Sequence, residues 1–179
     1  MILSAIRYFR DKKRKKRTKQ QYREQFVKKV YFTDSLLGTI EADYDVPNLT
    51  LTAENADLPA FGTYKPGMIT AEGFEEKDDG VVMRAIGLAY SRASEILEKL
   101  AETVQQEMQF DGSDSETIPA VSEIIEQIQM TEFHFIFTKE ERTMQVIGGV
   151  DIDIMTFGVN ALYRMDDGQW EYDAERIGD

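Results

Sequence analysis

The stretch that decides the fold runs from Asp78 to Met108 and reads DDGVVMRAIGLAYSRASEILEKLAETVQQEM. Its apolar residues recur every three or four positions, a spacing that places them on one stripe of an α-helix. The stripe begins with small side chains, which allow a sheet to approach closely, and ends with larger ones. We therefore expect one long helix with one buried side at the centre of the fold. The stripe consists of Val82, Ala85, Ile86, Ala89, Ala93, Ile96, Leu97, Leu100, Val104 and Met108.

The residues before this helix predict a hairpin and a long connection. Apolar and polar residues alternate over 38–44 and again over 49–53, as in half-buried strands, and Pro47 lies in the turn between them. Residues 54–79 have no period and contain several Gly and Pro, which indicates a loop-rich connection. We expect that connection to pack through its large apolar side chains, which are Leu58, Phe61, Tyr64 and Phe74.

The residues after the helix predict a second helix and then a meander of strands. Thr117 can cap the second helix, with Pro119 in its first turn. From Met130 the period changes to two and continues to about Glu175, with a bend or bulge expected at Gly148 and Gly149. The fold class is α+β: an antiparallel sheet, made of the N-terminal hairpin and the C-terminal meander, packs on the long central helix and the shorter second helix.

The charge is divided unevenly along the 179 residues. Residues 1–30 hold twelve Lys or Arg and two acidic residues, a balance of +10, whereas the remainder has a balance of −22. We therefore divide the chain into a basic helical arm, residues 1–30, and an acidic α+β domain, residues 31–179. Within the arm, Tyr22, Phe26, Val27 and Val30 are spaced as on a helix.

The basic arm has three interpretations. It is a helix that leans on the acidic body, an anchor on an anionic membrane surface, or a segment that binds nucleic acid. Because charge runs are usually solvated, the first interpretation is favoured. The basic residues concerned are Arg10, Lys12, Lys13, Arg14, Lys15, Lys16, Arg17 and Lys19.

Catalytic chemistry has little support in the sequence. Cysteine is absent, and His134 is the only histidine, placed by its alternation with Phe133 and Phe135 on the less buried side of a strand. Asp151 and Asp153 are spaced to face the same way on a strand, where carboxylates can hold Mg²⁺ or Ca²⁺. A metal-dependent enzyme that uses these two residues is therefore the alternative to a protein without catalytic residues, metal or cofactor.

A second acidic row is expected on the last strand, where Glu171, Asp173 and Glu175 alternate with Trp170 and Tyr172. An acidic body attracts basic partners and repels nucleic acid and anionic membranes. We take these three acids as the candidate face for a basic protein partner. No apolar run reaches the roughly eighteen residues that span a bilayer. The lack of cysteine fits a reducing compartment, so we expect a cytoplasmic protein, peripheral at the membrane if the arm is an anchor.

Two short segments resemble a known family. The residues Leu37, Gly38, Thr39 and Ile40, together with Phe157 and Gly158 ahead of the turn at residues 166–168, resemble an uncharacterised bacterial α+β domain family that occurs among toxin-immunity proteins. In that family a histidine often follows the second glycine, where this chain has Val159, so no site residue is transferred. The resemblance implies a non-enzymatic immunity or inhibitor-type protein whose basic partner is a toxin.

Overall fold

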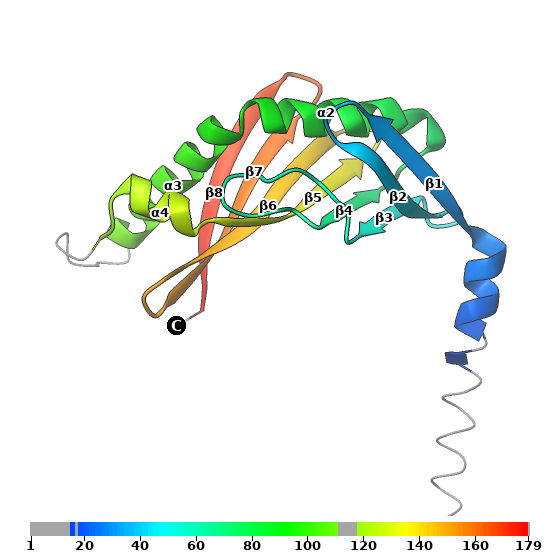
Figure 1. Cartoon of the computed structure of the whole chain (residues 1–179), viewed down its shortest axis with the longest axis horizontal. Helices are drawn as coiled ribbons and strands as arrows, with labels where there is room; N and C mark the ends of the chain where they lie inside the picture. The colour runs from blue at the N-terminus through cyan, green and yellow to red at the C-terminus, as the bar shows by residue number, and fades with distance from the viewer. Residues whose placement is uncertain (1–14, 17, 111–117, 179) are drawn as a thin grey trace, which may run out of the picture.

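The computed structural model describes residues 15–16, 18–110 and 118–178. Eight strands form one sheet in which the spatial order β1 to β8 is the order along the chain, and every neighbouring pair is antiparallel except β4 and β5. The expected α+β class with helices on one side of the sheet is confirmed (Figure 1). The strands are β1 (Val27–Asp34), β2 (Gly38–Asp45), β3 (Thr50–Glu54), β4 (Met68–Glu72), β5 (Gln129–Phe137), β6 (Arg142–Ile152), β7 (Met155–Arg164) and β8 (Gln169–Gly178).

The parallel pair results from the helical connection between β4 and β5. That connection contains the 3₁₀-helix η1 (Glu76–Asp78) and the helices α2 (Asp79–Ser91), α3 (Ala93–Phe110) and α4 (Val121–Gln127). It crosses one side of the sheet and brings the chain back to start β5 in the same direction as β4. No described helix is long and apolar enough to cross a membrane.

The predicted apolar stripe is buried at every position except Ala93, which is half-buried. Two helices carry the stripe, however, so the prediction of one long helix is wrong. The break is at Arg92, whose φ of −115° and ψ of 13° are not helical. Just before it, the Ser91 hydroxyl donates a hydrogen bond to the Leu88 carbonyl (2.7 Å), the kind of contact that competes with regular helix bonding.

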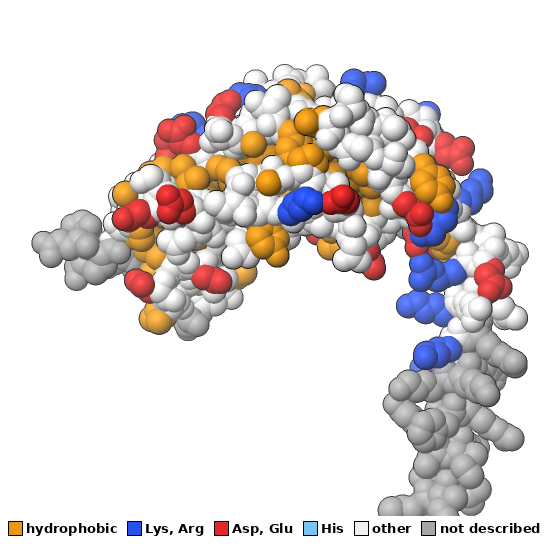
Figure 2. Space-filling view, viewed as in Figure 1, with side chains coloured by type: hydrophobic (Ala, Val, Ile, Leu, Met, Phe, Trp, Pro, Cys, Tyr) orange, Lys and Arg blue, Asp and Glu red, His pale blue; other side chains and the backbone are white. Residues whose placement is uncertain are grey.

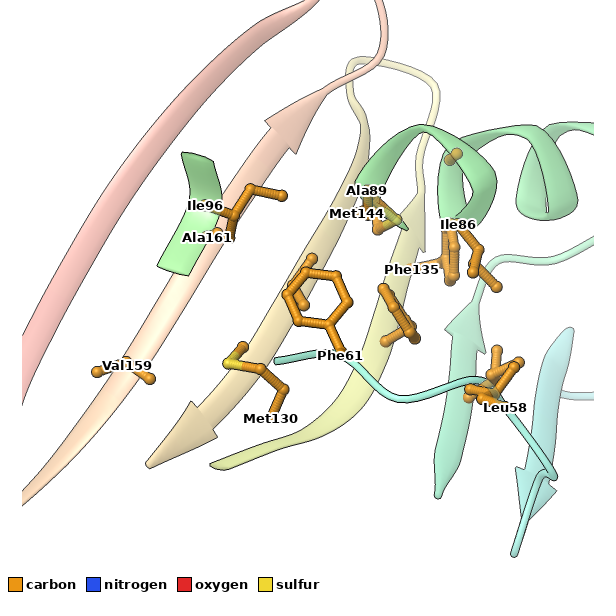
Figure 3. Packing of buried hydrophobic residues seen from close by; sticks show 14 of the residues in the cluster. Leu58, Phe61, Ile86, Ala89, Ile96, Met130, Phe135, Met144, Val159 and Ala161 are labelled. Atoms are coloured by element: carbon orange, nitrogen blue, oxygen red, sulfur yellow. The ribbon is translucent and has the colours of Figure 1, made fainter. Parts of the chain in front are cut away.

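The connection over residues 54–67 packs between the helices and the sheet. Phe61 is fully buried, and its ring lies 5.4 Å from that of Tyr90 on α2 and 6.1 Å from that of Phe133 on β5. Figure 3 shows Leu58 and Phe61 in the same apolar layer as the side chains of the helices and of β5 to β7. The expected packing is confirmed for Leu58, Phe61 and Phe74, whereas Tyr64 is 46% exposed.

The structure corrects three further expectations. Val27 and Val30 belong to β1, so the helix of the arm ends at residue 26 and the domain boundary placed at residue 30 falls inside a strand. Residues 68–72 form strand β4, whereas the sequence predicts a loop-rich connection there. Gly148 and Gly149 lie within one continuous strand, β6, and the bulge is on the facing strand β5.

The helix α4 begins at Val121, and the expected cap at residue 117 lies outside the described residues.

Candidate binding surface on the helix-free side of the sheet

The side of the sheet opposite α2, α3 and α4 is mainly polar; we call it the helix-free face. The strand register places one residue from each strand in a continuous row across it, and only one of the eight is apolar. Most of these side chains are half-buried against their neighbours and still reach solvent. The row consists of Lys29, Asp43, Thr52, Thr70, His134, Gln145, Leu162 and Glu171.

The predicted acidic row lies on this face, on the edge strand β8. Glu171 is paired with Arg164, whose guanidinium donates two hydrogen bonds of 2.9 and 3.2 Å and lowers the pKa of the Glu171 carboxyl. Asp173 is opposite Asn160 and Glu175 is opposite Gly158, so neither has a basic residue as its cross-strand neighbour on β7. Two of the three predicted acids therefore keep a negative charge that no neighbour across the strand neutralises.

At the other end of the face, the acids of β2 are neutralised by basic residues. The Lys29 ammonium lies 2.6 Å from the Glu41 carboxylate and 2.9 Å from that of Asp43, which is also paired with Arg23. The contact with Lys29 is the main cause of the lowered pKa of both carboxyls. The hydroxyl of Tyr22 donates a hydrogen bond to Asp45 (3.0 Å). These contacts fasten the last turns of the arm helix to the sheet.

An open groove of about 780 Å³ lies between this end of the sheet and the arm helix. Thr50, Thr52 and Glu54 at the β3 side and Lys19 of the arm helix are among its lining residues. Figure 2 shows Lys and Arg side chains gathered along the arm helix, while acidic side chains are distributed over the body. Lys15, Lys16 and Lys19 are exposed. The remaining basic residues of the predicted arm, Arg10, Lys12, Lys13, Arg14 and Arg17, lie outside the described residues.

In the middle of the face, Thr70 connects Glu132 and His134 across the parallel strand pair. Its hydroxyl contacts the Glu132 carboxylate and lies 2.6 Å from His134 Nδ1. This confirms that His134 is on the less buried side of its strand. A relay of the Ser-His-Asp kind needs the hydroxyl and the carboxylate on different ring nitrogens. Here the carboxylate, 3.7 Å from Nδ1, is on the same side of the ring as the hydroxyl, so the group ties two strands together and does not form such a relay.

Asp151 and Asp153 do not form the pair of carboxylates that the sequence predicted. Strand β6 ends at Ile152, and Asp153 lies in the hairpin turn with a φ of 54°. The Asp151 carboxylate accepts a hydrogen bond from the Thr156 hydroxyl (2.8 Å). In the described part of the chain, no three His, Asp or Glu side chains are grouped closely enough to hold a metal ion.

One buried acid, Asp78, could not be predicted from the sequence. Asp78 is 4% exposed; one oxygen accepts a hydrogen bond from Arg142 (2.7 Å) and the other from the Glu75 N–H (3.0 Å). It thereby joins the start of α2 to the β5–β6 hairpin. Glu75, Glu76 and Asp79 lie beside Asp78 in the sequence, and nothing in this run of acids distinguishes Asp78 as the buried one. Asp78 lies on the helix side of the sheet, away from the helix-free face, and we take its role to be structural.

Comparison of the chain with family models, with curated proteins and with solved structures finds no match in any of the three.

Proposed function

We propose that this chain is a non-enzymatic protein-binding domain whose helix-free face binds a basic surface of another protein. The observation that carries the proposal is the location of four acids whose cross-strand partners in the register are not basic. Glu54, Glu72, Asp173 and Glu175 all project from the polar, helix-free side of one sheet. A broad face of half-buried polar groups with unneutralised charge is suited to a charge-complementary partner, because complementary potentials accelerate encounter and reject like-charged proteins.

The overall charge supports the same class of partner. The chain carries 33 acidic and 21 basic residues, and twelve of the basic ones lie in the first thirty. An acidic body of this kind repels nucleic acid and attracts cationic proteins at long range. The resemblance to toxin-immunity proteins suggests that the basic partner is a toxin. A toxin gene beside the gene for this chain would support that part of the proposal.

Affinity capture from the source cell tests the proposal when three forms of the full chain are compared. The first form is the native chain. The second carries Glu54→Gln, Glu72→Gln, Asp173→Asn and Glu175→Gln, which remove four charges from the helix-free face. The third carries Glu98→Gln, Glu107→Gln, Glu126→Gln and Glu140→Gln, which remove the same charge from α3, α4 and the β5–β6 turn.

We expect the native chain and the third form to recover the same basic protein at low salt, and the second form to lose it. High salt should release it from both, because exposed charges are screened beyond about 10 Å at 0.1 M salt. Equal recovery by all three forms, or recovery of acidic proteins alone, would contradict the proposal. A melting curve of each form shows whether a loss of binding comes from a loss of folding.

A further inference from the structure

Strand β8 is an edge of the sheet, and it is long. It runs for ten residues, Gln169–Gly178, and pairs with β7 on one side only. In an edge strand every second residue directs its backbone N–H and C=O away from the sheet, which makes the strand a template for another strand. In the described part of the chain no strand occupies that side of β8 (Figure 1).

The side chains of β8 specify what kind of strand can be added. On the helix-free face the acids Asp173 and Glu175 alternate along the edge. On the other face Trp170 and Tyr172 are half-buried and stacked, with ring centroids 6.4 Å apart. A strand added to β8 would therefore place one set of alternate side chains beside carboxylates and the other set beside aromatic rings. The matching sequence alternates basic and apolar residues.

Two buried polar atoms beside this edge have no hydrogen-bond partner in the described part of the chain. One is the indole N–H of Trp170, and the other is Oδ1 of Asn160, which is opposite Asp173. Buried polar groups in folded proteins are nearly always paired. The two atoms flank β8 on opposite sides of the sheet: Trp170 is on the side that α3 covers, beside Arg92, and Asn160 is on the helix-free face.

Pairing between two copies of this chain does not fit the charges. Two β8 strands side by side would bring Asp173 and Glu175 of one copy against those of the other, and like charges on paired strands are destabilising. The opposite edge, β1, does not supply the missing positive charge, because Lys29 is already paired with Glu41 and Asp43, and Lys28 with Glu76. The charges on β8 thus oppose self-pairing and admit a basic strand.

We propose that β8 is a strand-addition site, at which an extended basic segment of the partner protein pairs with the Gln169–Gly178 edge and extends the sheet. The segment has Lys or Arg at alternate positions facing Asp173 and Glu175, and apolar residues between them facing Trp170 and Tyr172. This inference rests on the proposed function, and it specifies that backbone pairing, in addition to charge, holds the partner.

The test uses the full chain and two capped ten-residue peptides of equal charge. One peptide alternates lysine and valine; the other has the same sequence with every backbone nitrogen methylated, so that none of its residues can donate a backbone hydrogen bond to the edge. Trp170 is the only tryptophan, so its fluorescence reports events at the edge itself. We expect the lysine–valine peptide to change that fluorescence in a saturable way and the N-methylated peptide to bind at least roughly tenfold more weakly, as loss of several backbone hydrogen bonds implies.

Two variants locate the binding. Asp173→Asn with Glu175→Gln should weaken lysine–valine binding by roughly fivefold, the effect of two screened surface charges. Glu126→Gln with Glu140→Gln, on α4 and the β5–β6 turn, should leave it unchanged. Equal affinity for both peptides, lost in the Asp173 and Glu175 variant, would overturn strand addition and leave the proposed function intact. No binding of either peptide, or lysine–valine binding that both variants retain, would overturn the inference at this edge.

Discussion

Gly73 joins β4 to η1 with a φ of 68°, in the left-handed region that only glycine adopts freely. A Cβ added there would lie 2.0 Å from the carbonyl oxygen of Phe137, which is backbone and cannot turn aside. Gly73→Ala should therefore lower the free energy of unfolding by about 2 to 4 kcal/mol, from backbone strain and overpacking together. Urea denaturation of the variant and the native chain measures the difference.

Gly67, at the other end of β4, supplies the matched control. No atom lies within 4 Å of a Cβ built on it, and its φ is not in the left-handed region. Gly67→Ala should change the free energy of unfolding by less than about 1 kcal/mol in either direction. Equal losses of stability in the two alanine variants would contradict the close contact between residue 73 and the Phe137 carbonyl of β5.

The ion pairs of Lys29 predict a pH dependence. Lys29 lowers the pKa of Glu41 and, with Arg23, that of Asp43. A carboxyl whose pKa is lowered in the folded state contributes stability above its unfolded pKa, about 4, and loses it as the pH falls through the folded pKa. The native chain should thus lose more stability between pH 5 and pH 2–3 than a Lys29→Met variant. Melting temperatures of the two chains across this range check the prediction, and parallel curves would contradict it.

The sequence could place single residues on a side of a strand but could not give their partners. His134, Glu171, Asp173 and Glu175 were placed correctly because alternation along one strand is local information. The contact between His134 and Thr70 depends on a parallel register between strands 64 residues apart, which no local pattern encodes. Asp153 was misplaced because alternation continues through a short hairpin turn as if the strand went on.

Helix α3 carries the part of the apolar stripe that packs on strands β7 and β8. Leu97 is 5% exposed, and its Cδ1 reaches to 2.6 Å from the point where a Cβ of Gly62 would be, so it fills the space between α3 and the connection. Leu97→Ala should lower the free energy of unfolding by about 2 to 5 kcal/mol, because the cavity cannot close completely. Thermal or urea unfolding measures the loss.

The neighbouring position gives the control for this helix. Glu98 is exposed, and alanine is a good helix former, so Glu98→Ala should alter the free energy of unfolding by less than about 0.5 kcal/mol. Glu95 is a poorer control because its carboxylate pairs with Arg92 (2.6 Å) at the junction of α2 and α3. Similar losses for Leu97→Ala and Glu98→Ala would mean that the helix faces the sheet with a different side.

Most elements could be predicted because an apolar period runs through them and turn residues mark where they end. Strand β4 has the same five-residue length as β3, which was predicted, but it lies inside residues 54–79, where several Gly and Pro indicate a loop. Val27 and Val30 of β1 were assigned to a helix because a spacing of three, next to a basic run that favours helix, fits the arm as well as a strand. The apolar spacing continues without change across Arg92, so the break between the two helices cannot be predicted from that spacing.

At the scale of the whole molecule, the two edges of the sheet differ in charge and in what covers them. The β1 edge follows the arm helix, and its lysines are neutralised by acids of β2 and η1. The β8 edge carries acids and has no neighbouring strand in the described part of the chain. The charge asymmetry seen along the sequence thus becomes a difference in charge between the two edges of the sheet.

The contacts of the arm helix predict how many N-terminal residues can be deleted before the domain loses stability. The contacts that fasten this helix to the sheet come from Tyr22 and Arg23, which pair with Asp45 and Asp43, whereas Lys15, Lys16 and Lys19 are exposed. Deleting residues 1–21 should therefore leave a chain that unfolds cooperatively, with a melting temperature within a few degrees of the native value, since exposed side chains contribute little. Deleting residues 1–26 should lower the melting temperature further, because both contacts and the ring packing of Tyr22 on Phe26 are lost.

Circular dichroism melts of the native and the two shortened chains make the comparison, and sedimentation with anionic liposomes adds a second readout. If the arm is a membrane anchor, the native chain should sediment with the liposomes at low salt and be released by moderate salt, since each Lys or Arg near the surface contributes roughly 1 kcal/mol. The chain without residues 1–21 should then stay in solution while melting normally. A chain without residues 1–21 that fails to fold, or that melts far below the native chain, would show that residues before Tyr22 are part of the folded body. Equal melting temperatures for the two shortened chains would contradict the stabilising role of Tyr22 and Arg23.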